Sequence, residues 1–87
     1  MGLDAVELIL EAEKHFGVSV PDERAEKAET VEKFARLLCE LRAQTEAPLP
    51  YDEVLLQLQQ IIAKMFKIPV ERIVPSAHFV KDLGLSQ

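Results

Sequence analysis

Few side chains in this sequence are chemically reactive, and they lie far apart in the chain. They are His15, Cys39, His78 and Ser86. A zinc site needs three or four ligands, and the two histidines have no companions at metal-ligand spacing. Ser86 lacks a neighbouring base, a nucleophile-elbow glycine pattern and an oxyanion loop, and no phosphate-binding glycine loop is present. Cys39 is the only cysteine and lies in an apolar helical pattern, so we interpret it as a packing residue. We therefore expect a protein that is not an enzyme.

The strongest candidate for a binding surface is the amphipathic stretch at residues 3–16. Its apolar positions follow helical spacing and are Leu3, Val6, Ile9, Leu10 and Phe16. Its acidic positions lie mostly on the remaining surface and are Asp4, Glu7, Glu11 and Glu13. The pattern predicts a helix with an apolar stripe toward the core and an acidic outer face. That face is either a solvated surface or a docking site, and both interpretations stay open at this point.

Composition limits the class of protein and of partner. The chain has 87 residues, 48% of them hydrophobic, a net charge of −5 and a pI of about 4.9. This length and hydrophobic content predict one folded domain and exclude disorder, and no apolar run is long enough to span a membrane. Acidity disfavours nucleic acid and anionic membranes as partners and favours a partner with a basic patch. No signal-peptide pattern is present, so we expect a cytosolic protein or one that has been imported and processed.

Local signals place two more elements in the first half of the chain. Gly17 ends the first helix, and Pro21 opens a short helix to residue 27. Thr30 is a good N-cap for a further helix that reaches residue 43, although Lys33 stands where a capping box has Glu. Within that helix we expect Arg36 and Arg42 to face the solvent.

The second half begins after a stiff linker at residues 45–50, which contains two prolines. Residues 51–66 give the strongest helical pattern in the sequence, with apolar residues every three or four positions. A short turn around Glu71 and a loop with Phe79 as a core anchor follow. No alternation typical of strands appears, so the fold class is all-α.

Two stretches of the chain resemble the acyl carrier protein family. The tail from Ile73 to Leu85 is similar to the family's first loop and to the Asp-Leu-Gly that leads into its modified serine, here Asp82-Leu83-Gly84. The stretches that resemble the family's four helices, in the family's order, are 51–66, 3–16, 20–27 and the start of the helix at 30–31. The resemblance implies a small helical bundle of three longer helices and one short one. It also implies a non-enzymatic carrier of acyl groups on 4'-phosphopantetheine in fatty acid or related biosynthesis.

The order of the two halves differs from that of the family. Residues 51–87 are similar to the family's N-terminal half, residues 3–44 to its C-terminal half, and residues 45–50 join them. The chain thus resembles a single carrier domain over 1–87 that is circularly permuted and cut beside the attachment site. The linker with its junctions, about seven steps from residue 44 to residue 51, spans at most roughly 23 Å. Either the linker closes the bundle in a monomer, or two chains exchange halves in a domain-swapped dimer.

The cut alters the attachment motif itself. The family has Asp-Leu-Gly, any residue, Asp, Ser and Leu, with phosphopantetheine on the serine oxygen. Counted from the tail, Gln87 takes the serine position; counted back from Leu3, Gly2 takes it. Ser86 lies one residue away and is the candidate attachment residue, and the alternative is an ordinary terminal serine.

The resemblance also implies a docking surface. Carrier enzymes such as the phosphopantetheinyl transferase, acyl synthases and acyltransferases dock on the acidic helix through Arg and Lys patches. The acidic positions that match that surface are Asp4, Glu7, Glu13, Glu23 and Glu26. An interior that shelters an acyl chain, or simply forms the core, would include Val6, Ile9, Phe34, Leu58 and Ile62. The alternative function is a carrier-like module without cofactor, which binds basic partners through its acidic helix.

Overall fold

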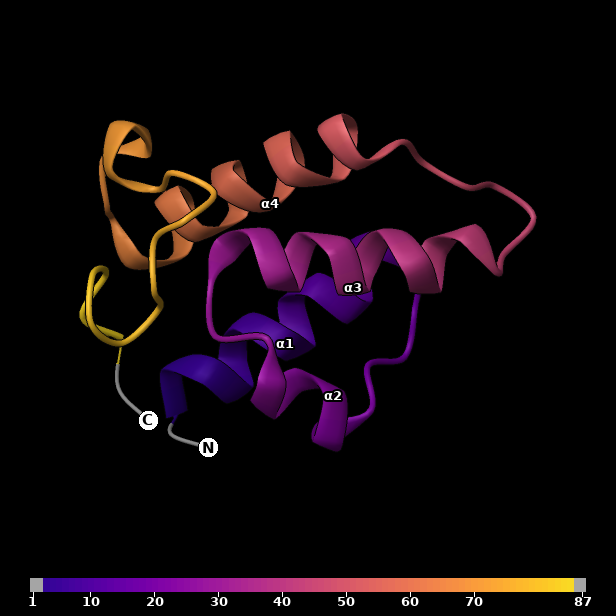
Figure 1. Cartoon of the computed structure of the whole chain (residues 1–87), viewed down its shortest axis with the longest axis horizontal. Coiled ribbons are helices and arrows are strands. Elements are labelled where there is room, and N and C mark those ends of the chain that lie inside the picture. The colour runs from indigo at the N-terminus through magenta and orange to yellow at the C-terminus, as the bar shows by residue number, and fades with distance from the viewer. Residues whose placement is uncertain (1–2, 86–87) are drawn as a thin grey trace.

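The computed structural model describes residues 3–85, and these form an all-helical bundle without a β-strand (Figure 1). Its elements are α1 (Leu3–Phe16), α2 (Asp22–Lys27), α3 (Val31–Ala43), α4 (Tyr51–Phe66) and a single 3₁₀ turn (Val70–Arg72). α4 runs antiparallel beside α3, α1 packs against α4, and the short α2 packs against α3. This confirms the predicted fold class and the predicted set of three longer helices and one short helix.

The core draws side chains from every part of the bundle. The large side chains that are almost completely buried are Phe16, Val31, Leu38, Val54, Leu58, Ile62 and Ile73. The tail contributes as well, because Leu83 and Leu85 are buried and Phe79 packs edge-on against Phe34 with ring centroids 6.0 Å apart. The prediction that Phe79 anchors the loop to the core is confirmed.

The helix ends follow their local sequence signals. Gly17 has a φ of +65°, the left-handed conformation that glycine adopts without steric cost at a helix end. The Oγ1 of Thr30 accepts a hydrogen bond from the backbone N–H of Lys33 at 3.2 Å, which caps α3. Pro50 lies immediately before α4 in an extended conformation. Local conformational preferences, with a side-chain cap at Thr30, therefore set these boundaries where the sequence predicts them.

The predicted core stripe of α1 is wrong in most of its members. The buried residues of this helix are Leu8, Ala12 and Phe16, whereas Leu3 and Leu10 are 76% and 59% exposed. Val6, which we also assigned to the interior, is 40% exposed, and Ile9 is half-buried. α1 has more apolar residues than one face can bury. The residues that it buries are spaced four positions apart and are Leu8, Ala12 and Phe16.

Arg42 is a second correction. It is half-buried rather than solvent-facing, and its guanidinium donates hydrogen bonds to the carbonyl of Phe16 at 2.5 Å and to the carbonyl of Ala47 at 2.6 Å. It thereby ties the C-terminal end of α1 and the linker to α3. Arg36 is exposed, as predicted, and forms an ion pair with Glu32.

The linker joins α3 to α4 within one chain. It leaves the end of α3, makes a turn around Thr45 and returns to the start of the neighbouring, antiparallel α4 (Figure 1). Besides the bond from Arg42, the linker is held by the Cys39 thiol, whose sulfur lies 3.4 Å from the carbonyl oxygen of Leu49. Its length is thus sufficient to close the bundle in a single molecule.

Candidate functional site

The outer face of α1 carries an apolar stripe with acidic neighbours. Leu3, Val6 and Leu10 recur at helical spacing on this face, and all three are exposed. Glu7 and Glu11 lie beside them and are exposed too. Because these exposed apolar side chains share one face of the helix, the face is a candidate contact surface. Sequence reasoning found the acids but assigned the apolar stripe to the core. The sequence signal for the exposed stripe was that residues 3–16 contain more apolar positions than one buried face of a helix can hold.

The five predicted docking acids are not equivalent in the structure. Glu7, Glu23 and Glu26 are exposed, and Asp4 is half-buried in the first turn of α1. Glu13 is half-buried, and its carboxylate accepts a hydrogen bond from the backbone N–H of Val20 at 2.7 Å. Glu13 therefore helps to hold the loop that follows α1. The structure also divides the set between two helices, since α2 packs on α3 while α1 packs on α4.

The tail that carries the Asp-Leu-Gly sequence is fixed to the start of α3. The backbone N–H of Val31 donates to the carbonyl of Ala77 at 3.0 Å, and that of Phe79 donates to the carbonyl of Glu29 at 3.0 Å. Thr30 and His78 form an isolated antiparallel bridge between the two segments. The tail is therefore part of the folded domain up to Leu85.

His78 organises the turn that precedes Gly84. Its Nδ1 accepts hydrogen bonds from the backbone N–H groups of Val80 and Lys81, both at 3.1 Å. Its own backbone N–H donates to the carboxylate of Asp82 at 2.7 Å. Because Nδ1 is an acceptor, the ring proton lies on Nε2, which is 3.4 Å from a carboxylate oxygen of Glu29. Sequence reasoning considered His78 only as a metal ligand and missed this role, although its bonds to Val80, Lys81 and Asp82 are local. Only the contact with Glu29 depends on the tertiary approach of the α2–α3 junction.

The tail ends in a turn at Gly84, which has a φ of +70°. A Cβ atom there would meet no atom within 4 Å, but the left-handed backbone favours glycine. Leu83 and Leu85, on either side of it, are 7% and 6% exposed and anchor the turn. Ser86, the candidate attachment residue, lies outside the described residues, as do Gly2 and Gln87.

Two further observations concern metal-ligand clusters and membrane-spanning helices. Within residues 3–85, no three side chains of the His, Cys, Asp or Glu type gather as metal ligands do. In the same part of the chain, none of the helices combines the length and the apolar character needed to cross a membrane.

Comparison with known proteins points to one family for part of the chain. The acyl carrier protein of Rubrobacter xylanophilus is 61% identical over 31 residues, which are 36% of this chain and 38% of that protein. The acyl carrier protein of Thermosynechococcus vestitus is 60% identical over 30 residues, which are 34% of this chain and 37% of that protein. The chain thus matches under two fifths of the length of these curated relatives. No family model and no solved structure matches. The relatives are named as carriers, which agrees with the prediction of a non-enzymatic protein.

Proposed function

We propose that this chain is a circularly permuted acyl-carrier-type protein. In this proposal it carries acyl groups on 4'-phosphopantetheine at Ser86, for fatty acid or related biosynthesis. The observation that carries the proposal is the high identity to acyl carrier proteins over about a third of the chain, in a bundle of three longer helices and one short helix. The cellular setting that fits is the cytoplasm, or the mitochondrial matrix.

The arrangement of the chain ends supports the permuted order. α1 begins at Leu3 and the anchored tail reaches Leu85 at the same end of the molecule's long axis (Figure 1). Joining these ends would restore the family's path from Asp-Leu-Gly into the acidic helix. In this interpretation residues 1–87 form one domain, with 3–44 and 51–87 as the exchanged halves and 45–50 as the new connection. Because the linker reaches from α3 to its antiparallel neighbour α4 within one chain, we propose a monomer rather than a domain-swapped dimer.

In this proposal the prosthetic group would lie beside the anchored tail. Gly84 has open space beside it, and the buried Leu85 fixes the backbone directly before Ser86. The Ser86 hydroxyl would be the oxygen that receives the phosphate, and the group, when bound, would supply the site that carries the acyl chain. The residues of this chain would hold and orient that arm through the turn that His78 stabilises.

Docking of partner enzymes would use the outer face of α1. Exposed Glu7, with the neighbouring apolar Val6 and Leu10, offers both charge and apolar area to a basic patch on a transferase or synthase. Asp4 lies on the same helix, whereas Glu23 and Glu26 would offer a second acidic surface on α2. Because Glu13 is engaged with the loop backbone, we assign it a smaller share of the binding.

The test of attachment is the intact mass after incubation with coenzyme A and a broad-specificity phosphopantetheinyl transferase. We expect a gain of one phosphopantetheine that maps to Ser86 and is absent in the matched variant Ser86→Ala. A gain that persists in Ser86→Ala, or no gain at all, contradicts attachment at Ser86.

The exposed apolar and acidic face also supports the alternative of a cofactor-free interaction module, since that face does not depend on the displaced serine. Titration of the unmodified chain against the same transferase separates the two. We expect Glu7→Lys to weaken binding about tenfold, because it places a positive charge against a basic patch, while thermal unfolding stays unchanged. Binding without mass gain favours the alternative, and equal affinity of Glu7→Lys and the parent contradicts docking through α1.

A further inference from the structure

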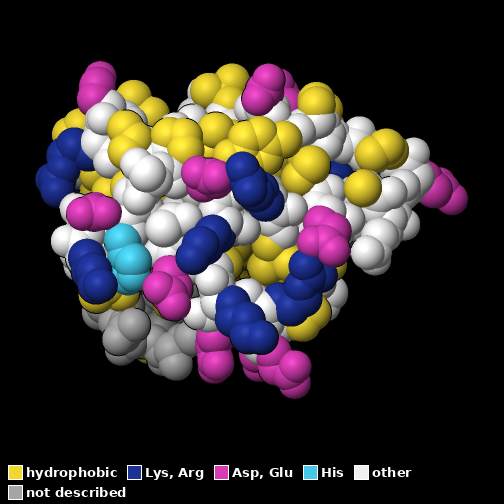
Figure 2. Space-filling model, in the orientation of Figure 1, with side chains coloured by type: hydrophobic (Ala, Val, Ile, Leu, Met, Phe, Trp, Pro, Cys, Tyr) yellow, Lys and Arg dark blue, Asp and Glu magenta, His cyan; other side chains and the backbone are white. Residues whose placement is uncertain are grey.

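A basic groove of about 390 Å³ lies between α2 and α3, on the side of the molecule that Figure 2 presents. The residues that line it are Arg24, Lys27, Ala28, Lys33, Arg36, Leu37 and Glu40. Four of them are basic and one is acidic, so the lining carries +3 in a chain of net charge −5. In Figure 2, dark-blue side chains surround a yellow, apolar floor on this face. The groove therefore stands out against the acidity of the rest of the protein.

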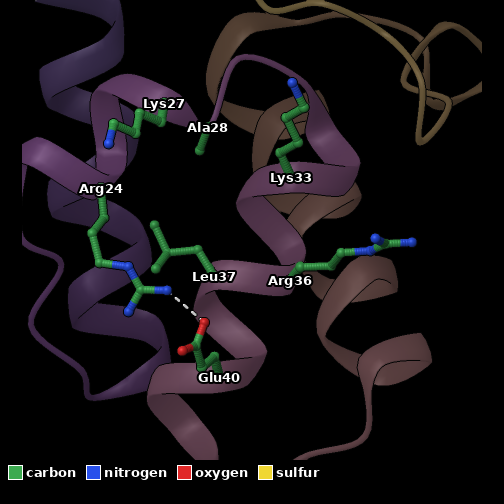
Figure 3. A pocket seen from close by; sticks show the side chains of 7 residues that line it. All are labelled: Arg24, Lys27, Ala28, Lys33, Arg36, Leu37 and Glu40. Carbon is green, nitrogen blue, oxygen red and sulfur yellow. Dashed lines mark hydrogen bonds and ion pairs between the residues drawn. The ribbon is translucent and has the colours of Figure 1, made fainter.

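Two of the four cations are available to a ligand. Arg24 forms an ion pair with Glu40, and Arg36 is occupied by Glu32 and by the ring of Tyr51. Lys27 on α2 and Lys33 on α3 extend in different directions in Figure 3, and neither forms an ion pair within residues 3–85. The fitting ligand is consequently a segment with at least two carboxylates.

The floor of the groove adds an apolar requirement. It consists of Leu37, which is 5% exposed, and the half-buried Ala28. At about 390 Å³ the groove is near the lower end of the size range of ligand sites, so it holds side chains from one face of a segment. The occupant therefore presents apolar side chains with acids beside them.

The chain itself carries such a segment, the outer face of α1. There Leu3, Val6 and Leu10 are exposed beside Glu7 and Glu11. We propose that the α2–α3 groove of one molecule binds the α1 face of a second copy of this chain. Its own α1 does not enter the groove, because that helix is fixed in the bundle by its buried side.

The contact proposed here is heterologous, since one copy gives its groove and the other its helix face. Such contacts leave a free groove and a free face at the two ends, so they build short chains of molecules or a ring. Local attraction acts against the mutual repulsion of two molecules of charge −5, which makes the association weak and sensitive to salt. It also covers the face proposed for partner enzymes, so self-association and docking compete.

Sedimentation velocity of the full, unmodified chain tests the proposal. Over concentrations from about 10 µM to 1 mM, we expect the average mass to rise at low ionic strength and to fall back at high ionic strength. A chain that stays monomeric over that range at low salt overturns the proposal. The measurement needs no cofactor, so its failure is separate from failure of attachment at Ser86.

A pair of charge-reversal variants makes the test specific. The groove variant is Lys27→Glu with Lys33→Glu, and the face variant is Glu7→Lys with Glu11→Lys. Glutamate at position 33 completes the capping box begun by Thr30, which protects the fold of α3. We expect each variant alone to associate at least about tenfold more weakly than the parent.

Mixing the two variants provides the decisive result. The intact face of the groove variant meets the intact groove of the face variant, so the mixture is expected to form heterodimers with at least parental affinity. A matched control, Lys64→Glu with Lys81→Glu, has the same change in net charge as the groove variant but lies outside the groove. If the control weakens association as much as the groove variant does, or if the mixture stays monomeric, the proposal is wrong.

Discussion

α4 and α1 pack against each other but use their apolar residues differently. α4 lies against α3, α1 and the 3₁₀ turn, and three of its residues are 0% exposed. They are Val54, Leu58 and Ile62. α1 packs chiefly on α4, and it leaves Leu3 and Leu10 more than half exposed. The comparison shows that the number of neighbours, rather than apolar periodicity alone, decides how much of a helix is buried. The apolar side chains that remain are available for binding.

The largest expected difference is between truncating a buried leucine in α4 and truncating an exposed leucine in α1. Leu58→Ala removes a fully buried side chain and leaves a cavity, so we expect the free energy of unfolding to fall by about 2–5 kcal/mol. Leu10→Ala removes an exposed side chain and is expected to change it by less than about 0.5 kcal/mol. Urea denaturation of both variants measures this difference. If both variants lost the same free energy of unfolding, Leu10 would be as important to the fold as Leu58, and the contrast between α1 and α4 would be wrong.

A smaller effect is expected at the hydrogen bonds that connect α1 to its neighbours. Arg42→Ala leaves the carbonyls of Phe16 and Ala47 without their donor, and we expect a loss of about 2 kcal/mol in unfolding free energy. Arg24→Ala is the control, because its ion pair with Glu40 is about half exposed and contributes about 0.5 kcal/mol. If the two variants unfold at the same urea concentration, Arg42 does not tie α1 to α3.

The smallest expected change separates two acids within α1. Glu13→Ala removes the acceptor for the Val20 N–H, so we expect unfolding free energy to fall by about 1 kcal/mol. Glu7→Ala removes an exposed charge and is expected to leave stability within about 0.5 kcal/mol. Thermal unfolding followed by circular dichroism compares them. If only Glu7→Ala lowered stability, Glu7 would have the structural role and Glu13 the surface role.

The candidate surface was only partly predictable from sequence. Acidic side chains such as Glu7 and Glu26 were expected on the outside, because charged groups are rarely buried without a partner. Glu13 was expected there too, but the loop after α1 returns past it and places the backbone of Val20 within hydrogen-bond distance. The basic groove was not expected at all, since Lys27 and Lys33 lie on separate helices and only packing brings them together.

The sequence by itself determined the all-helical class and most helix ends. Gly17, Thr30 and Pro50 act on backbone groups within a few residues, so their effect is independent of the rest of the fold. Only the tertiary structure decided which side of α1 faces the core and that Arg42 turns inward. These outcomes depend on which elements meet in space, and a local pattern of residues does not contain that information.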